Sequence, residues 1–379
     1  MNIVLDRIDT NFDIESNRCW VGAFAGIFPD GRAVITIQPL RLTGSDIFYS
    51  VHTFFSNDKG KSWQGPVEQN NLKRQPYHNN MEIVVSGLIP EYHKASGKML
   101  LTGHTVIYEN DEIMPDPRPG HTAYCIWDDE KNVLNDFKVL ELPESDSTFF
   151  NCGPGTSQRV DLDDGTILQP IQYLTRKDAE DSWGNCYSST VLHCSFDGKE
   201  MKYLNHGNSL SIEEPRGLYE PSLICFNGKY FMTLRNDFKG YVSSSKDGLN
   251  FDSPKVWCFD DGQEIGNYCT QQHWFRLGDK LYLVYTRRGA NNDHVFRHRA
   301  PLFTAEVDTE KLCLIRNTEK IVVPERGARL GNFNCVQVSD DEAWVVVAEW
   351  MQNGKGREGV ERCMKYGSDN SIFIAKLYS

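Results

Sequence analysis

The octapeptide Ser56-Asn57-Asp58-Lys59-Gly60-Lys61-Ser62-Trp63 is the stretch that decides the fold class. Asp58 can accept hydrogen bonds from the amides of its own turn, and Gly60 permits a positive φ at that position. Trp63 then carries the following strand into the core. The stretch therefore predicts a tight hairpin turn between two strands.

Short strand-like runs recur along the whole chain, mostly bounded by Gly, Asp, Asn or Pro. No segment keeps a 3.6-residue apolar period, so we expect few and short helices. The expected strands are 32–38, 47–55, 98–106, 123–127, 166–172, 189–194, 222–226, 230–235, 280–286, 302–307, 343–349 and 372–377.

One phrase repeats within this pattern: an apolar strand, a polar turn and a second apolar strand. Its turns are Asp30-Gly31, Asp164-Gly165, Asn227-Gly228, Gly278-Asp279 and Asp340-Asp341. From the second copy onward the copies lie roughly 50–65 residues apart, which suits one four-stranded blade per copy. The pattern predicts an all-β fold, a single β-propeller domain over residues 1–379 with about six blades, or five as the alternative.

Composition excludes several classes of partner and site. The 379 residues carry a net charge of −12, which argues against nucleic acid or an anionic membrane as partner. No apolar run approaches the roughly 18 residues of a membrane span. Neither metal-binding signatures nor phosphate-binding glycine loops occur, so we expect no metal and no cofactor.

The termini and cysteines bear on the compartment. The first 20 residues contain four acidic side chains and no apolar stretch, so no signal peptide is expected there. The 11 cysteines are odd in number and lack C-x-x-C spacing, which favours reduced thiols. These features predict a cytoplasmic protein, with a secretory signal trimmed from the chain as the alternative.

The octapeptide fits Ser-x-Asp-x-Gly-x-Ser/Thr-Trp, the pattern of the Asp-box or bacterial neuraminidase repeat. Ser195-Phe196-Asp197-Gly198 and Ser245-Lys246-Asp247-Gly248 look like shortened copies. Further phrases follow in the order found in the sialidase (neuraminidase) superfamily, among them Gly153-Pro154-Gly155 and Cys269-Thr270-Gln271. The chain thus resembles that superfamily over nearly its full length.

The resemblance implies a set of site residues. Three arginines would hold the carboxylate of an acidic sugar, because guanidinium groups bind carboxylates in a bidentate way and stay charged. In this sequence they are Arg18, Arg235 and Arg299, with Glu349 bracing the first of them. Arg329, in a second basic cluster with Arg326, is a further candidate for substrate binding.

Two acidic residues take the catalytic roles in this resemblance. Asp46, in the loop before the octapeptide, would be the general acid and base, and Glu220 would assist the nucleophile or a water. The family's nucleophilic tyrosine is missing, because Phe333 stands at the corresponding place. Tyr219 and Tyr268 lie near other matched segments and are candidates to replace it.

Two Gly-His-Thr phrases, at His104 and His121, suggest a different chemistry. A pair of histidines with a tyrosine could catalyse elimination across a uronate, whereas the structural alternative places both in blade turns or strands. Three functions follow as hypotheses: a sialidase-like exo-glycoside hydrolase that releases a terminal acidic sugar, a lyase acting on uronates, and a non-catalytic glycan-binding propeller. In each case the expected partner is a carbohydrate, an acidic sugar or oligosaccharide.

Overall fold

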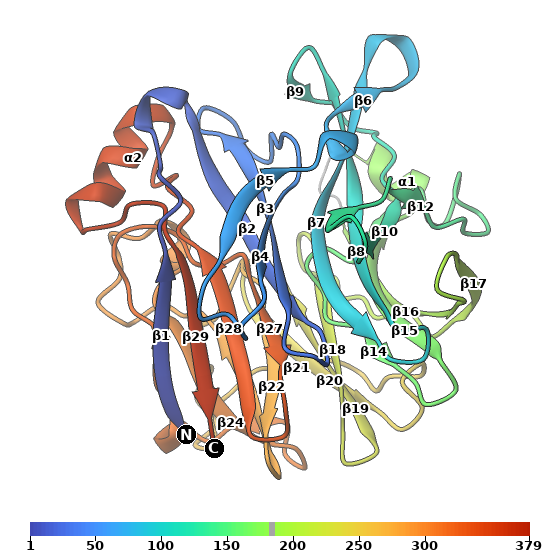
Figure 1. The fold of residues 1–379 in the computed structure, drawn as a ribbon. Coiled ribbons are helices and arrows are strands. Elements are labelled where there is room, and N and C mark those ends of the chain that lie inside the picture. The colour runs from blue at the N-terminus through green and yellow to red at the C-terminus, as the bar shows by residue number, and fades with distance from the viewer. Residues whose placement is uncertain (182–185) are drawn as a thin grey trace.

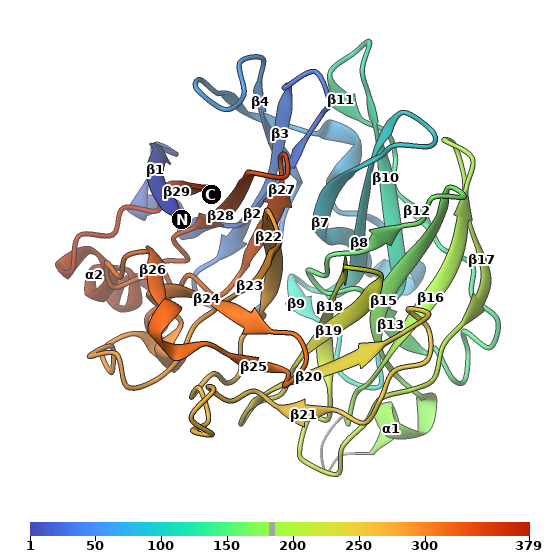
Figure 2. The ribbon, with the colours of Figure 1, turned by 90° about the horizontal axis from the view of Figure 1, so that it is seen from below.

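The structure is a computed structural model that describes residues 1–181 and 186–379. It contains six antiparallel sheets, which stand radially around one axis when the molecule is seen from below (Figure 2). The prediction of an all-β propeller with about six blades is confirmed.

The blades follow one another along the chain. Blade 1 contains β2 (Arg18–Ile27), β3 (Ala33–Arg41), β4 (His52–Ser56) and β5 (Gln64–Glu68). Blade 2 contains β6 (Gln75–Pro76), β7 (Glu82–His93), β8 (Lys98–Glu109), β9 (Glu112–Ile113), β10 (Thr122–Asp128), β11 (Val133–Leu134) and β12 (Lys138–Val139). Blade 3 contains β13 (Asn151–Gly153), β14 (Val160–Asp161), β15 (Thr166–Leu174), β16 (Ser188–Phe196) and β17 (Met201–His206). Blade 4 contains β18 (Tyr219–Phe226), β19 (Lys229–Arg235), β20 (Gly240–Ser245) and β21 (Lys255–Val256). Blade 5 contains β22 (His273–Leu277), β23 (Lys280–Tyr285), β24 (Leu302–Asp308), β25 (Cys313–Leu314) and β26 (Lys320–Val323).

Blade 6 joins the two ends of the chain. It contains β27 (Phe333–Gln337), β28 (Glu342–Ala348) and β29 (Ile372–Tyr378), and its outer strand is the N-terminal β1 (Asn2–Ile8). Strands β1 and β29 pair antiparallel, with Asn2 opposite Tyr378 and Ile8 opposite Ile372. The two termini therefore lie side by side at one end of the molecule (Figure 1).

The core is a set of apolar layers between neighbouring blades. Side chains alternate along each strand, so Val34 packs between blades 1 and 2 while Ile35 packs between blades 6 and 1. Leu168 and Ile171 of β15 likewise serve opposite faces, toward blades 4 and 2 respectively. Both faces of the sheets are thus buried, which explains the near-continuous apolar runs seen in the sequence.

The octapeptide turn forms as predicted between β4 and β5. The amides of Lys61 and Ser62 donate to Asp58 Oδ1 at 3.1 and 2.9 Å, and Gly60 has a φ of +66°. The Gly60 amide donates to Ser56 Oγ at 2.9 Å. Trp63 packs into the layer between blades 6 and 1.

The five repeated turns each connect an inner strand of a blade to the next strand outward, in blades 1, 3, 4, 5 and 6. Blade 2 makes the same connection between β7 and β8 through residues 94–97, which lack that signal. Helices are few, as expected: the described α-helices are α1 (Arg176–Glu180) and α2 (Gly356–Lys365). None of the described helices is long and apolar enough to cross a membrane. All eleven cysteines are free thiols.

Candidate active site

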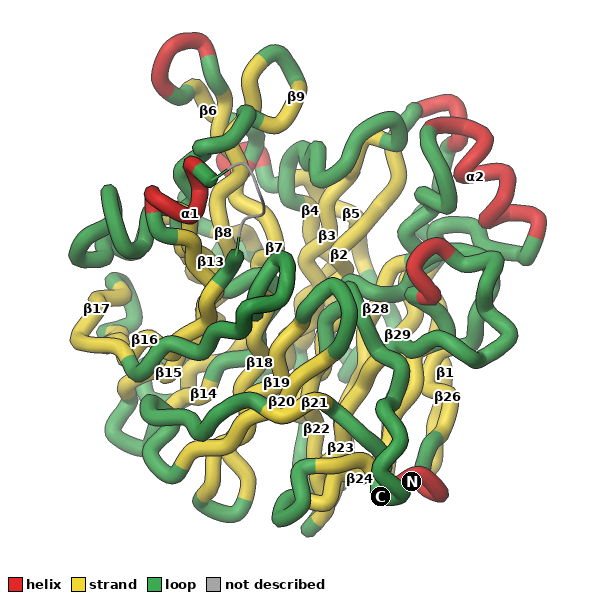
Figure 3. The backbone as a smooth tube through the Cα atoms, turned by 180° about the vertical axis from the view of Figure 1, so that it is seen from behind, coloured by secondary structure: helices red, strands yellow, loops and turns green. Residues whose placement is uncertain are grey.

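A polar cavity of about 370 Å³ opens at one end of the propeller. Ile113 of β9 lines it, which places it at the end that carries the β6 and β9 hairpins, opposite the termini (Figures 1 and 3). Residues of all six blades or their connecting loops contribute to its wall. Its charged lining consists of six arginines and two acidic residues, namely Arg118, Arg216, Arg235, Arg297, Arg299, Arg329, Asp46 and Glu220.

Breaks in the innermost strands turn side chains toward this cavity. The register shifts in β2, β7 and β18, and each shift contains a residue with positive φ: Gly22, Gly87 and Glu220. Gly155 has a φ of +65° between β13 and β14 of blade 3. Glycine adopts this conformation without strain, whereas a glutamate at a φ of +46° is strained. Blade 4 therefore keeps a strained acidic residue where three other blades have glycine.

Glu220 is held in place from several sides. Its carboxylate accepts from Arg235 Nη1 at 2.6 Å, and its amide donates to Gln172 Oε1 at 2.6 Å. An ideal Cβ on Gly155 would lie 2.8 Å from Glu220 Cγ, so a side chain at residue 155 would displace the glutamate. The Gly-Pro-Gly phrase in the sequence thus makes room for Glu220.

Arg235 and Arg299 meet at Cys269. Arg235 ends β19, and its Nη2 donates to Cys269 Sγ at 3.4 Å. Arg299 follows the short 3-10 turn Phe296–His298, and its Nε and Nη2 donate to the carbonyl of Cys269 at 3.1 and 2.6 Å. Both side chains are buried, with Arg235 8% and Arg299 4% exposed.

Arg329 lies next to Arg299. The Leu330 amide donates to the Arg299 carbonyl at 2.6 Å, and a Cβ on Gly331 would lie 2.8 Å from Arg299 Cδ. The Arg329 guanidinium lies 4.0 Å from the centre of the Phe296 ring and 5.0 Å from that of Trp350. Two aromatic faces thus hold the guanidinium in place. We call Arg235, Arg299 and Arg329 the arginine cluster.

The arginine cluster carries more positive charge than its protein partners neutralise. Burial, followed by the charges of Arg299 and Arg297, lowers the pKa of Arg329 to about 9. Burial and then Arg235 lower the pKa of Arg299. For Arg235 burial acts in the same direction, but Glu220, Tyr219 and Cys269 together oppose it, and the pKa is raised. Among the described residues, no carboxylate lies within ion-pair distance of Arg299 or Arg329.

Asp46 and His104 line the same cavity. Asp46 lies between β3 and β4, accepts from Ser45 Oγ at 2.8 Å, and its carbonyl accepts from the Tyr108 hydroxyl at 2.7 Å. His104 comes from β8; burial lowers its pKa, against the opposing charges of Glu220 and Asp46. Its Nδ1 is buried and has no hydrogen-bond partner within the described part of the chain. A neutral imidazole and two carboxylates therefore accompany the arginine cluster.

Comparison with known proteins identifies the fold. The structure of a protein of unknown function from Dyadobacter fermentans DSM 18053 aligns with a TM-score of 0.63 at 14% identity, over 99% of both chains. A Hadza microbial sialidase aligns with a TM-score of 0.63 at 10% identity, and Trypanosoma rangeli sialidase with 0.61 at 11%. The fold is sialidase-like.

The similarity to the two sialidases lies in the three-dimensional structure, at low sequence identity. It covers 95% and 98% of this chain but 66% and 59% of the two sialidase chains, so the chain spans less than two thirds of their length. No family model and no curated protein matches the sequence. The roles of individual residues therefore depend on the geometry of this cavity.

Of the residues that the sequence pointed to, Asp46, His104, Glu220, Arg235, Arg299 and Arg329 line the cavity, and Arg18, His121 and Glu349 do not. Arg18 begins β2 on the surface, where its guanidinium stacks 3.7 Å from the centre of the Tyr49 ring. His121 precedes β10, and its amide and carbonyl pair with Thr105. The expected convergence of Arg18 with Arg235 and Arg299 is thus not met, and Arg329 lies beside these two arginines instead.

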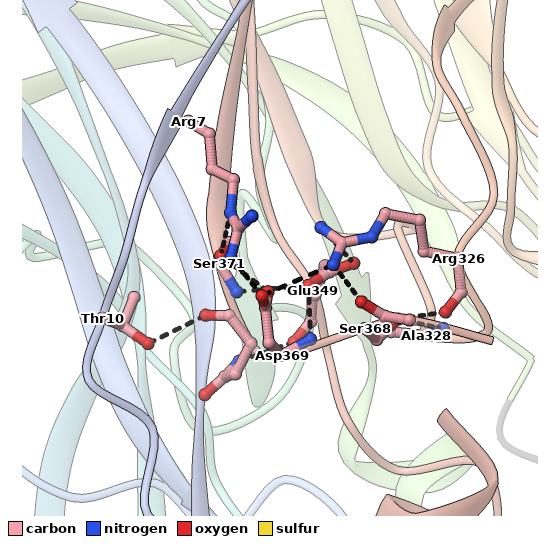
Figure 4. A network of polar contacts seen from close by, with 10 residues as sticks. Arg7, Thr10, Arg326, Ala328, Glu349, Ser368, Asp369 and Ser371 are labelled. Atoms are coloured by element: carbon pink, nitrogen blue, oxygen red, sulfur yellow. Dashed lines mark hydrogen bonds and ion pairs between the residues drawn. The ribbon is translucent and has the colours of Figure 1, made fainter. Parts of the chain in front are cut away.

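Glu349 belongs to a network that fastens the N-terminal strand to blade 6 (Figure 4). It accepts from the amides of Asp369 and Ser371 at 3.0 and 3.2 Å and lies 3.7 Å from Arg326. Arg7 of β1 donates to Ser371 Oγ at 2.7 Å. Glu349 therefore braces Arg326 and the chain before β29, not Arg18 as expected.

The structure shows where Phe333 and the two candidate replacement tyrosines, Tyr219 and Tyr268, lie. Phe333 is fully buried in β27 and packs edge-on against His273, with ring centres 4.9 Å apart. Tyr268 does not line the cavity; its hydroxyl is hydrogen-bonded to His298. Tyr219 does line it, but its hydroxyl donates to Asp237 and burial raises its pKa.

Sequence reasoning missed three residues at the mouth of the cavity: Arg118, Tyr187 and Arg216. They come from loops of different blades, and no motif or spacing in the sequence connects them. Only the folded structure connects two of these loops, at Gly217, where an ideal Cβ would lie 2.1 Å from the Tyr187 carbonyl oxygen.

Proposed function

We propose that this protein is a carbohydrate-active enzyme, a glycoside hydrolase that binds the carboxylate of an acidic sugar with Arg235, Arg299 and Arg329. The observation that carries the proposal is the arginine cluster itself. Its members are adjacent, largely buried, and among the described residues only Arg235 has a carboxylate partner. A ligand carboxylate would supply the missing negative charge through bidentate hydrogen bonds.

Asp46 and Glu220 supply groups for hydrolysis. Asp46 would pass a proton to the leaving-group oxygen as the glycosidic C–O bond breaks. Water would add to the anomeric carbon and give its proton to Glu220, whose position Arg235 fixes at 2.6 Å. Water is the expected nucleophile, because Phe333 has no hydroxyl and the Tyr219 hydroxyl is engaged with Asp237.

One observation favours elimination as a second candidate. His104 is neutral at pH 7 because its pKa is lowered by burial, and its unpartnered Nδ1 can accept a proton. The arginine cluster would then neutralise the carboxylate of a uronate while His104 removes the proton next to it. The electrons of that C–H bond form the new double bond, and the glycosidic C–O bond breaks as Asp46 gives its proton to the leaving oxygen. His121 has no part in this scheme, because it does not line the cavity.

Product analysis on a panel of acidic oligosaccharides tests the proposal. Hydrolysis releases a reducing sugar without ultraviolet absorbance from a new double bond, whereas elimination creates that absorbance. We expect Asp46→Asn to lower kcat by about 100-fold or more while binding persists, and Arg235→Ala to abolish binding. Retained binding without turnover in the wild type would assign a glycan-binding role. Unchanged activity in both variants would refute the site.

A further inference from the structure

The cavity carries more unpaired positive charge than one ligand carboxylate would neutralise. Arg235 pairs with Glu220 at 2.6 Å, and Arg118 lies 3.8 Å from Asp116. The other four lining arginines, Arg216, Arg297, Arg299 and Arg329, have no ion pair with any described residue. In a protein of net charge −12, this concentration of unpaired positive charge indicates a ligand with more than one negative group.

Arg216 lines the cavity beside the arginine cluster, because its guanidinium shares the Tyr219 ring with that of Arg235, which lies 4.6 Å from the ring centre. It lies in the loop before β18, and its guanidinium is 5.1 Å from the ring centre of Tyr219 and 5.6 Å from that of Tyr187. The Tyr187 amide donates to the Arg216 carbonyl at 3.2 Å, and the Leu218 amide donates to the Tyr187 carbonyl at 2.8 Å. The side chain is exposed, yet its backbone is held in register with Tyr187.

Arg118 approaches Tyr187 from the loop between β9 and β10. Its Nη1 donates to the Met114 carbonyl at 3.0 Å, and its own carbonyl accepts from Asn151 at 3.2 Å. Arg118, Tyr187 and Arg216 line the same cavity, and the Arg216 guanidinium lies 5.6 Å from the centre of the Tyr187 ring. Two arginines and one tyrosine from three separate loops thus converge.

We propose that Arg118, Tyr187 and Arg216, called the mouth subsite, bind a second anionic group of the substrate, a carboxylate or a sulfate ester. The inference rests on the proposed function and narrows it. The substrate is then an acidic oligosaccharide with charged groups on two neighbouring sugars, one at the arginine cluster and the next at the mouth subsite. Arg216 supplies the unpaired charge and Arg118 a second guanidinium, while the buried Tyr187 ring supports the Arg216 guanidinium from 5.6 Å.

Calorimetric titration with probes of matched chemistry and different charge tests this inference. The probes are N-acetylneuraminic acid and its α2,8-linked dimer, galacturonic acid and its α1,4-linked dimer, and a uronate-containing disaccharide with and without a 6-sulfate. We expect the wild type to bind at least one doubly charged probe about tenfold or more tightly than its singly charged counterpart. The dimers report a second carboxylate, and the disaccharide pair reports a sulfate ester.

Substitution of Arg216 separates the mouth subsite from the arginine cluster. Arg216→Gln should remove the advantage of the doubly charged probe and leave singly charged binding within about twofold, whereas Arg216→Lys should keep part of it. Arg357→Gln, on the exposed surface of α2, controls for net charge. Equal loss for both probes, or no advantage of a second charge in the wild type, would overturn the inference. Failure of Arg299→Gln to weaken the singly charged probes would instead refute the proposed function.

Discussion

The guanidinium of Arg235 and the carboxylate of Glu220 form a 2.6 Å ion pair at the wall of the cavity, with side chains that are 9% and 18% exposed. Glu220 adopts a φ of +46° to make this contact. The pair lets one arginine of the cluster stay charged when no ligand is bound, while its neighbours Arg299 and Arg329 remain without such a partner. A strained residue that is retained at a cavity is typical of a functional site.

Breaking this pair should destabilise the fold. Glu220→Gln leaves the Arg235 charge buried without its counter-ion, so we expect the free energy of unfolding to fall by about 3 kcal/mol in urea denaturation. The matched control is Glu264→Gln, which removes an exposed partner of Lys239 and should cost less than about 1 kcal/mol. Equal effects of the two substitutions would show that the Glu220 pair is not important for stability.

Removing Arg329 should have the opposite effect on stability. Its pKa is lowered to about 9, so Arg329 stays charged at neutral pH but the folded state holds this charge less favourably than the unfolded state does. We expect Arg329→Met to raise the unfolding free energy at pH 7 by about 1 kcal/mol while it abolishes binding of acidic sugars. Because the unfolded state holds the proton more tightly than the folded state does, the advantage of the variant should shrink as the pH rises above about 9.

The control for this experiment is Arg326→Met. Arg326 lies within 4 Å of Glu349 and Asp369, so its loss should destabilise the protein and leave binding intact. A destabilised Arg329→Met protein would contradict the claim that the charge of Arg329 is uncompensated.

His273 should make the fold sensitive to acid. Burial lowers its pKa to about 3, from an ordinary value of 6.5. The unfolded state therefore binds the proton first as the pH falls below 6.5, and the contribution of the neutral histidine is lost progressively toward pH 3, on the order of 5 kcal/mol at most. His273→Leu should flatten this part of the stability profile. Parallel profiles for variant and wild type in chemical denaturation at pH 4 to 7 would refute the assignment.

The missing tyrosine predicts a difference in catalytic intermediates. Trypanosoma rangeli sialidase has been crystallised as a covalent intermediate with 2,3-difluorosialic acid. With Phe333 in the core and water as nucleophile, this protein should form no covalent adduct with difluorinated acidic sugars, as judged by intact-protein mass spectrometry. A covalent adduct mapped to Tyr219 or Tyr187 would contradict this prediction and identify that tyrosine, in place of water, as the nucleophile.

The sequence predicted well those features that depend on local chemistry. Asp58 and Gly60 could be placed in their turn because each acts on its own backbone, and the repeated turns predicted the blade count because each joins strands of one blade. Blade 2 lacked the turn signal, since residues 94–97 make the same connection with other residue types. Because blade 2 lacks this turn signal, the sequence left the number of blades open between five and six.

Site residues were harder to predict because they depend on which way a strand break turns a side chain. Arg235 and Arg299 line the cavity, whereas Arg18 lies on the surface, before the register shift in β2. Glu349 could be recognised as a buried acid, but its partner Arg326 comes from another loop. The same reason hid Arg118, Tyr187 and Arg216, which meet only when three loops are folded together.

The most direct test of the central claim is a comparison of an acidic sugar with its methyl ester, which keeps the shape and removes the charge. Calorimetric titration with N-acetylneuraminic acid and galacturonic acid, each against its ester, should show that at least one free acid binds about 100-fold more tightly than the ester. Arg299→Gln should abolish that difference. Equal binding of acid and ester by the wild type, or a difference that survives Arg299→Gln, would contradict the account.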